Sequence, residues 1–87
     1  MYKILLTKKA DKDLAKFTPK DIINILNKIN QLSYPFSSLL NIKKLSTLPM
    51  GYRLRINKIR VIFEVDHNTK TIWIRKIGYR KDIYRFS

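Results

Sequence analysis

Residues 52–66 read YRLRI, NK and IRVIFEVD, two runs in which apolar and polar side chains alternate on either side of Asn57-Lys58. Alternation with a period of two is typical of β-strands that bury one face. Asparagine tolerates a positive φ, so the Asn57-Lys58 pair predicts a tight hairpin turn. In the hairpin that follows from this turn, Arg55 lies directly opposite Arg60.

The two faces of this hairpin differ in character. One face is apolar and is expected to join the core; its members are Tyr52, Leu54, Ile56, Ile59, Val61, Phe63 and Val65. The other face carries Arg53, Arg55 and Arg60, and we call it the arginine face. Like charges set directly across two strands cost roughly 0.2–1 kcal/mol. The repulsion becomes favourable when a phosphate lies between the guanidinium groups, although a solvated basic face would show the same pattern.

The charge of the chain also indicates a polyanionic partner. Its 87 residues include 19 Lys and Arg against 6 Asp and Glu, a formal net charge of +13. Such a balance is typical of proteins that meet nucleic acid, an acidic membrane face or an acidic protein. Every arginine lies after Gly51, whereas the residues before it carry only lysines. Arginine grips phosphate with a planar fork of donors, so we expect the working surface in the second part of the chain.

The first part of the chain predicts a strand followed by two helices. Tyr2–Thr7 is a short, mostly apolar strand, and Thr7 can cap a helix that extends through Phe17. Thr18 followed by proline is a typical start for a second helix. Apolar residues at helical spacing continue from there to about Leu32. The two helices are therefore expected to form an αα-hairpin with an exposed lysine surface.

The rest of the chain supplies one irregular segment, one further strand and a short tail. Residues 33–50 are interrupted by proline and glycine, and four of their apolar side chains are expected to tuck under the sheet: Leu39, Leu40, Ile42 and Leu45. Residues 71–77 predict a strand whose broken alternation indicates a β-bulge. Residues 79–87 form the tail.

These elements predict an α+β fold. We expect a small, antiparallel-rich twisted sheet of about four strands with the N-terminal αα-hairpin packed on one face, in a single domain of residues 1–87. The chain has no cysteine, so neither a disulfide nor a thiolate metal site is expected. No apolar run approaches the length of a membrane span, and the opening strand is too short for a signal peptide, so a cytoplasmic location is expected.

Other candidate chemistry is sparse. His67 is the only histidine and is expected as an exposed turn residue, which excludes a ribonuclease with paired histidines. The acids are scattered and show no metal-ligand spacing, so no metal is expected. Glu64 and Asp66 share the face of Arg60, where they either act as a base or balance the arginines. Trp73 either packs at an edge or stacks on a base.

Read together, YRLRI (52–56), IRVIFEV (59–65) and IGYRKDIYR (77–85) resemble the RelE toxins of the RelE/ParE superfamily. The resemblance implies the toxin of a type II toxin–antitoxin pair, a cytoplasmic endoribonuclease that cuts messenger RNA in the ribosomal A site without a metal. In such an enzyme the 2′-hydroxyl attacks the adjacent phosphate. The alternatives are a ParE-like gyrase inhibitor without nuclease chemistry and a non-catalytic RNA-binding or ribosome-binding module.

The resemblance also implies roles for individual residues. Arg53 and Arg55 would hold the RNA backbone, and Arg60 would stabilise the pentacoordinate phosphorane. Arg80 would support or protonate the leaving 5′ oxygen, and Tyr84 would stack on the nucleotide and orient it. Further contacts to messenger and ribosomal RNA would come from basic side chains around this site: Lys44, Lys58, Lys81 and Arg85.

The chain departs from the RelE pattern at three positions. Some members have lysine where Arg55 stands, and arginine is a poor base because it keeps its proton. Arg55 would then make the 2′-hydroxyl more acidic, while Tyr84 or Glu64 would take the proton. Tyr79 occupies a position that is often histidine, and Arg75 one that is often apolar. A cognate antitoxin is expected to offer acidic side chains and an amphipathic helix, and to wrap around the toxin so that it covers the arginine face.

Overall fold

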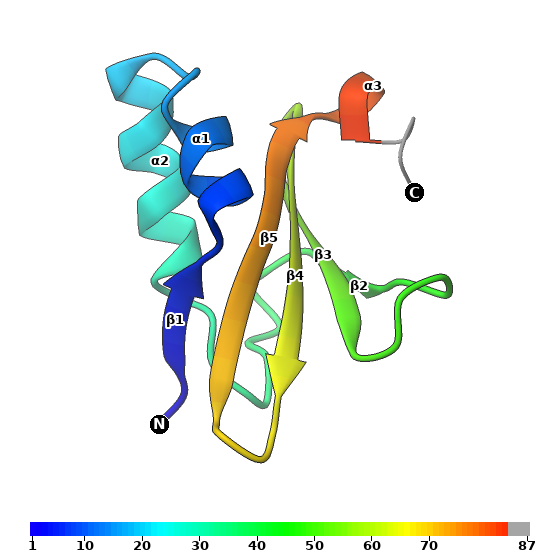
Figure 1. Cartoon of the computed structure of the whole chain (residues 1–87). Helices are drawn as coiled ribbons and strands as arrows, with labels where there is room; N and C mark the ends of the chain where they lie inside the picture. Colours follow the sequence, from blue (N-terminus) through cyan, green and yellow to red (C-terminus); the bar gives the residue numbers. More distant parts are fainter. Residues whose placement is uncertain (84–87) are drawn as a thin grey trace.

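A computed structural model of the chain describes residues 1–83 and has five strands and three helices within that part. Figure 1 shows α1 and α2 side by side at one side of the sheet, with α3 at the far end of β5. The elements are, in chain order, β1 (Lys3–Leu6), α1 (Lys8–Leu14), α2 (Pro19–Ile29), β2 (Ile42–Lys44), β3 (Gly51–Ile56), β4 (Ile59–Asp66), β5 (Thr71–Tyr79) and α3 (Arg80–Ile83).

The strands form one sheet in the order β1-β5-β4-β3-β2. β1 pairs with β5 in parallel, and the other neighbours are antiparallel. The predicted α+β class and the antiparallel-rich sheet are therefore confirmed. The sheet has one strand more than the four expected, because β2 spans only three residues and is too short to show an alternating pattern. No helix of residues 1–83 is long and apolar enough to cross a membrane.

Both predicted helix starts are confirmed by their caps. The Thr7 hydroxyl accepts a hydrogen bond from the Ala10 backbone N–H at 3.1 Å, and the Thr18 hydroxyl accepts one from Asp21 at 3.2 Å. Both helices end three residues before the predicted positions, since α1 stops at Leu14 and α2 at Ile29. The residues that follow continue as tighter turns with bonds between residues three apart, which the apolar spacing alone does not distinguish from an α-helix.

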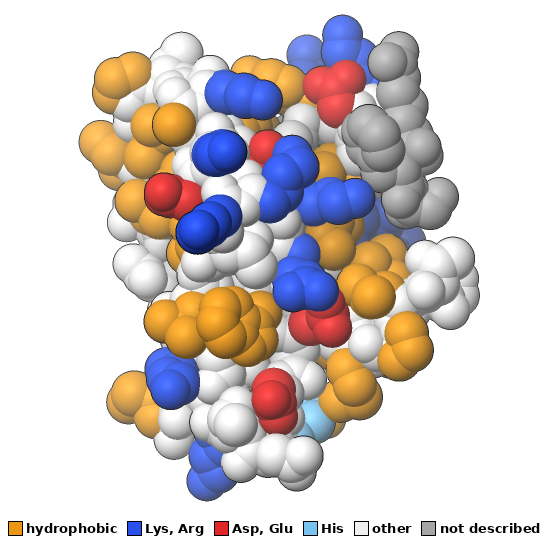
Figure 2. All heavy atoms as spheres, in the orientation of Figure 1, with side chains coloured by type: hydrophobic (Ala, Val, Ile, Leu, Met, Phe, Trp, Pro, Cys, Tyr) orange, Lys and Arg blue, Asp and Glu red, His pale blue; other side chains and the backbone are white. Residues whose placement is uncertain are grey.

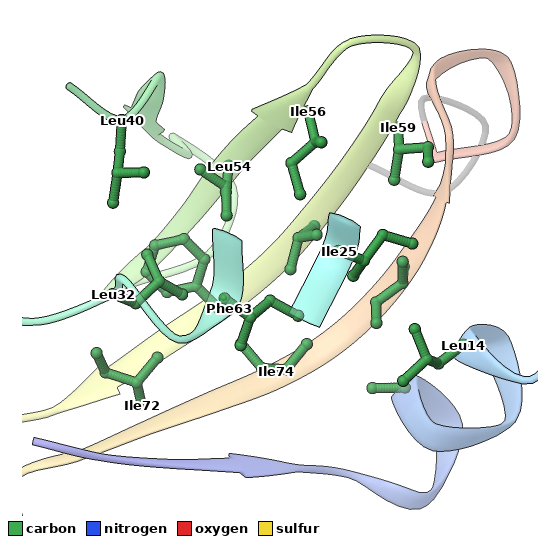
Figure 3. Close-up of a cluster of buried hydrophobic side chains, with 14 of the residues drawn as sticks. Leu14, Ile25, Leu32, Leu40, Leu54, Ile56, Ile59, Phe63, Ile72 and Ile74 are labelled. Carbon is green, nitrogen blue, oxygen red and sulfur yellow. The ribbon is translucent and has the colours of Figure 1, made fainter. Parts of the chain in front are cut away.

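The core lies between α2 and the apolar face of the sheet. Figure 3 shows Phe63 and Leu54 on the same side of the strands as Ile25 of α2. These three side chains are fully buried, and they form one cluster with the apolar residues of β4 and β5. Leu40 joins this cluster as predicted, but the expectation for Leu39 was wrong, because its side chain is 88% exposed.

The hairpin of β3 and β4 has the predicted register. Asn57 in the turn has a φ of 54°, and Arg55 pairs directly with Arg60. The predicted bulge in β5 is also present: Ile62 pairs with Lys76 while its neighbour pairs with Ile74, which leaves Arg75 without a partner in the ladder. The bulge keeps the apolar side chains of β5 on the core face at both ends of the strand.

His67 is more than the exposed turn residue that the sequence indicated. The Tyr2 hydroxyl lies 2.7 Å from Nδ1 of His67, and the Tyr34 ring contacts the imidazole at 4.5 Å between centroids. The histidine thus belongs to an aromatic cluster that ties the β4–β5 turn to the N-terminus. Its partners come from segments far apart in the chain, so the sequence pattern did not reveal them.

Candidate nucleic-acid interface

The arginine face is built by the β3–β4 hairpin. Arg55 and Arg60 are direct cross-strand partners, and Arg60 is in turn opposite Gly78 of β5. Arg53 lies two residues along β3, opposite Ile62. Alternation on pleated strands therefore places the three arginines on the face turned away from the core, as predicted.

Arg60 differs from Arg53 and Arg55 because its side chain is buried against the backbone of its own hairpin. The residue is only 4% exposed, and its Nη1 donates hydrogen bonds to the carbonyl oxygens of Asn57 at 2.6 Å and Ile59 at 3.1 Å. Its Nε is buried and has no hydrogen-bond partner among the described residues. A buried donor without a partner costs about 1–3 kcal/mol. An acceptor that reached this N–H would therefore remove an existing cost to the folded state. The sequence did not indicate that the Arg60 side chain is buried, because this depends on the directions of the backbone carbonyls near the turn.

A lysine that the sequence analysis passed over joins the arginine face. Lys43 of β2 pairs with Arg53, whereas Lys44 pairs with Tyr52. Successive residues of a strand point to opposite faces, so Lys43 lies on the arginine face and Lys44 on the core side. The Lys44 ammonium stands 5.2 Å from the centre of the Tyr52 ring. The pairing of β2 was the missing signal, because without it neither lysine could be assigned to a face.

The tail helix brings further cations to the hairpin turn. The backbone N–H of Arg80 donates to the carbonyl of Lys58 at 2.9 Å, which docks the start of α3 on the β3–β4 turn. Arg80, Lys81 and Lys58 are all exposed. Together with Arg55 and Arg60 they gather at one end of the sheet.

Glu64, a candidate base, is engaged elsewhere. Its Oε1 lies 2.7 Å from Nε of Arg75, in an ion pair whose atoms do not align as a hydrogen bond. Glu64 is four residues along β4 from Arg60, and its cross-strand partner is Trp73, which is 37% exposed. The position favours the role of balancing charge over that of a base.

Two predicted residues, Tyr84 and Arg85, lie outside the described part of the chain. Within residues 1–83, no group of three or more His, Cys, Asp or Glu side chains is placed to hold a metal ion.

No protein-family model and no curated relative matches the chain, but solved structures do. A chain of the RelB–RelE antitoxin–toxin complex from Methanococcus jannaschii is 28% identical, covers 94% of this chain and 96% of its own, and has a TM-score of 0.72. A chain of the archaeal RelE–RelB complex from Pyrococcus horikoshii is 25% identical, with coverages of 91% and 94% and a TM-score of 0.76.

The isolated RelE toxin of E. coli shares the fold as well, with a TM-score of 0.73 at 18% identity over 98% of this chain and 93% of that chain. The similarity therefore extends over nearly the whole chain. The resemblance to RelE-type toxins that the sequence motifs indicated is confirmed.

Proposed function

We propose that this chain, with its RelE-type toxin fold, is the toxin of a type II toxin–antitoxin pair and an endoribonuclease that cuts messenger RNA in the ribosomal A site. The observation that carries the proposal is the direct pairing of Arg55 with Arg60 at the end of the sheet where α3 delivers Arg80. The register places two like charges on directly opposite residues at a cost to stability, and a phosphate bound by both side chains would offset that cost.

The proposed reaction uses the nucleophile that RNA already carries. The 2′-oxygen forms a bond to the adjacent phosphorus while the bond from phosphorus to the 5′ oxygen breaks, which leaves a 2′,3′-cyclic phosphate and a free 5′-hydroxyl. The pentacoordinate phosphorane carries extra negative charge. Arg55 and Arg60 would stabilise that charge, and Arg80 would support or protonate the departing 5′ oxygen.

Arg60 acts in this scheme only if its side chain turns outward. Its Nη1 would exchange the carbonyls of Asn57 and Ile59 for phosphate oxygens, a stronger partner because the acceptor is charged. The unpaired Nε supports this exchange, since it gains the acceptor that it lacks in the free chain. Binding of RNA would therefore drive the rearrangement.

The proton of the 2′-hydroxyl has fewer candidate acceptors than the sequence indicated. Glu64 is held by Arg75, and the Asp66 carboxylate accepts hydrogen bonds from the backbone N–H groups of Asn68 and Thr69, so we propose Tyr84 as the protein base. Arg55 would also make the 2′-hydroxyl more acidic, because it stabilises the developing alkoxide. The proposed substrate, translated messenger RNA, is found in the cytoplasm, so we propose that the reaction takes place there.

Primer extension on translated message tests the proposal. Expression of the chain should produce 5′ ends within codons, and Arg60→Ala should abolish them. Arg60→Lys is the matched variant: it retains the charge but loses the fork, and we expect it to retain little cleavage. Double-stranded DNA breaks together with intact message would instead assign the chain to the gyrase inhibitors.

A second candidate, an RNA-binding module without cleavage, is favoured by one observation. The burial of Arg60 against the backbone carbonyls leaves, among residues 1–83, Arg55 and Arg80 as the exposed arginines of this end. If Arg60 keeps those hydrogen bonds when RNA binds, the face holds a phosphate backbone without completing a site for the phosphorane. Binding with an intact message and an unaffected Arg60→Ala variant would support this candidate.

The proposed partner is an antitoxin protein encoded beside the toxin. The similar chains from Methanococcus jannaschii and Pyrococcus horikoshii come from RelB–RelE complexes. The partner of this chain would offer acidic side chains to the arginine face and thereby compete with RNA for the same cations. Co-expression with the neighbouring gene should suppress both toxicity and cleavage.

A further inference from the structure

A cleft of about 420 Å³ opens between α1, the end of β5 and α3. Its floor is mainly apolar and is formed by Phe17, Ile77, Gly78, Tyr79 and Ile83. Its rim carries the charged side chains Lys9, Lys16, Lys76, Asp13 and Asp82. This site is distinct from the arginine face but shares the end of β5 with it.

The cleft exists because β1 is shorter than its neighbour. β1 ends at Leu6, and Thr7 makes the last backbone bond to β5, to the carbonyl of Ile74 at 3.0 Å. Beyond that point α1 takes the place of a strand at this edge. The Asp13 carboxylate bridges the gap by accepting a hydrogen bond from the backbone N–H of Ile77 at 3.0 Å. The floor is thus fixed to α1.

Two aromatic rings contact each other in the lining of the cleft. The rings of Phe17 and Tyr79 have centroids 5.2 Å apart and planes tilted by 48°, so they contact each other without stacking. Phe17 is half-buried, whereas Tyr79 is 44% exposed. Tyr79 is therefore the more accessible of the two aromatic residues.

The charge around the cleft favours an anionic ligand. The acids on the rim are partly neutralised, because both oxygens of Asp13 are used, one by Ile77 and the other by Lys9. Figure 2 shows Lys and Arg side chains gathered over α1 and the upper part of β5, with few acidic ones between them. The cleft therefore suits a planar group that is attached to a negatively charged backbone.

The cleft and the arginine face meet at the end of β5. Gly78 on its floor is the direct cross-strand partner of Arg60, and Tyr79 immediately precedes Arg80. A Cβ on Gly78 would lie 3.3 Å from the Ile83 side chain, so glycine allows α3 to pack closely here. Tyr79 is opposite Ile59 of the core face, so a strand of RNA whose phosphate lies at Arg55 and Arg60 would reach this opening by passing around the end of β5.

We infer that the cleft receives one unpaired base of the RNA strand, stacked on Tyr79, with the flanking phosphate facing the lysines of the rim. The inference rests on the proposed function, since it extends the same RNA strand by one nucleotide. Base stacking on an aromatic ring tolerates any base. The cleft would therefore hold the strand in place without choosing its sequence.

Binding of an uncleavable RNA tests this subsite apart from the chemistry. A fluorescent single-stranded hexanucleotide with 2′-O-methyl groups has no nucleophile, so its anisotropy with the full chain reports binding alone. Tyr79→Ala should weaken binding about fivefold or more, in line with loss of a stacking ring, while Tyr79→Phe should bind like the parent. Tyr34, which is 42% exposed, gives the matched control Tyr34→Ala with unchanged binding.

Photo-cross-linking locates the base directly. The same hexanucleotide carrying 5-iodouracil should cross-link to the tryptic peptide that contains Tyr79, and Tyr79→Ala should remove that product. No RNA binding, equal binding by Tyr79→Ala, or cross-links only elsewhere would overturn the subsite. Polyglutamate that binds with equal affinity and the same dependence on Tyr79 would also overturn it, in favour of an acidic protein segment.

These outcomes separate the subsite from the nuclease proposal. If Tyr79→Ala weakens binding while no codon is cut by the parent chain, the subsite holds and the nuclease proposal fails. If cleavage depends on Arg60 while Tyr79→Ala changes neither binding nor cross-linking, the nuclease proposal holds and the subsite fails.

Discussion

The carboxylate of Asp13 in α1 accepts a hydrogen bond from the backbone N–H of Ile77 in β5, at 3.0 Å and across 64 residues of sequence. The N–H belongs to the stretch of β5 that extends past the end of β1, where no strand is present to accept it. Asp13 thus replaces a strand at the sheet edge. The bond holds the segment that carries Arg80 and the cleft floor against the first helix.

Replacement of this carboxylate should destabilise the whole fold. In Asp13→Ala the buried N–H of Ile77 loses its acceptor, and we expect the free energy of unfolding to fall by about 1.5–3 kcal/mol. Asp13→Asn retains an acceptor oxygen and should cost less. Urea denaturation followed by circular dichroism measures both variants, and equal stabilities for Asp13→Ala and the parent would contradict the role assigned to this bond.

A second prediction concerns the close approach of a loop to β3. A Cβ on Gly51 would lie 2.7 Å from the side chain of Leu48, so Gly51→Ala forces Leu48 to move. Overpacking of this kind costs about 1–3 kcal/mol. In the double variant Gly51→Ala, Leu48→Gly every clashing atom of the Leu48 side chain is absent, including the Cβ at 2.8 Å, and part of the lost stability should return. Thermal unfolding of the single and double variants tests this, and additive losses would show that the contact is not the cause.

The sequence predicted the register of the hairpin of β3 and β4, because a two-residue turn and strict alternation leave only one pairing, while β3 begins one residue earlier than predicted, at Gly51. It also predicted a bulge in β5 from the broken alternation, and the structure places that bulge at Arg75. It could not predict β2, whose three residues gain strand structure only by pairing with β3. The burial of Arg60 escaped prediction for a similar reason, since turn carbonyls that are not visible in a residue pattern hold its side chain.

The pairing of Arg55 with Arg60 predicts a trade between stability and binding. Arg55→Thr removes a like-charge cross-strand contact and introduces a β-branched residue, so the free energy of unfolding should rise by about 0.2–1 kcal/mol. The same change removes a phosphate ligand and should weaken RNA binding. Chemical denaturation and anisotropy on the same samples give both quantities. A variant that loses stability and binding together would show that Arg55 serves the fold.

Two adjacent lysines of β2 provide the sharpest test of the arginine face. Lys43 is opposite Arg53 on that face, whereas Lys44 is opposite Tyr52 on the core side. Each lysine that contacts a phosphate of single-stranded RNA adds about 0.7 to the slope of log affinity against log salt. Lys43→Ala should therefore weaken binding and lower that slope by about this amount. The resemblance implied an RNA contact for Lys44, but the register of β2 places it on the core side, so Lys44→Ala should leave the slope unchanged. The two variants remove the same charge one residue apart, so net charge cannot explain a difference between them. Equal slopes for both would mean that RNA does not distinguish the two faces of the sheet, and the binding surface would then have to be sought elsewhere on the chain.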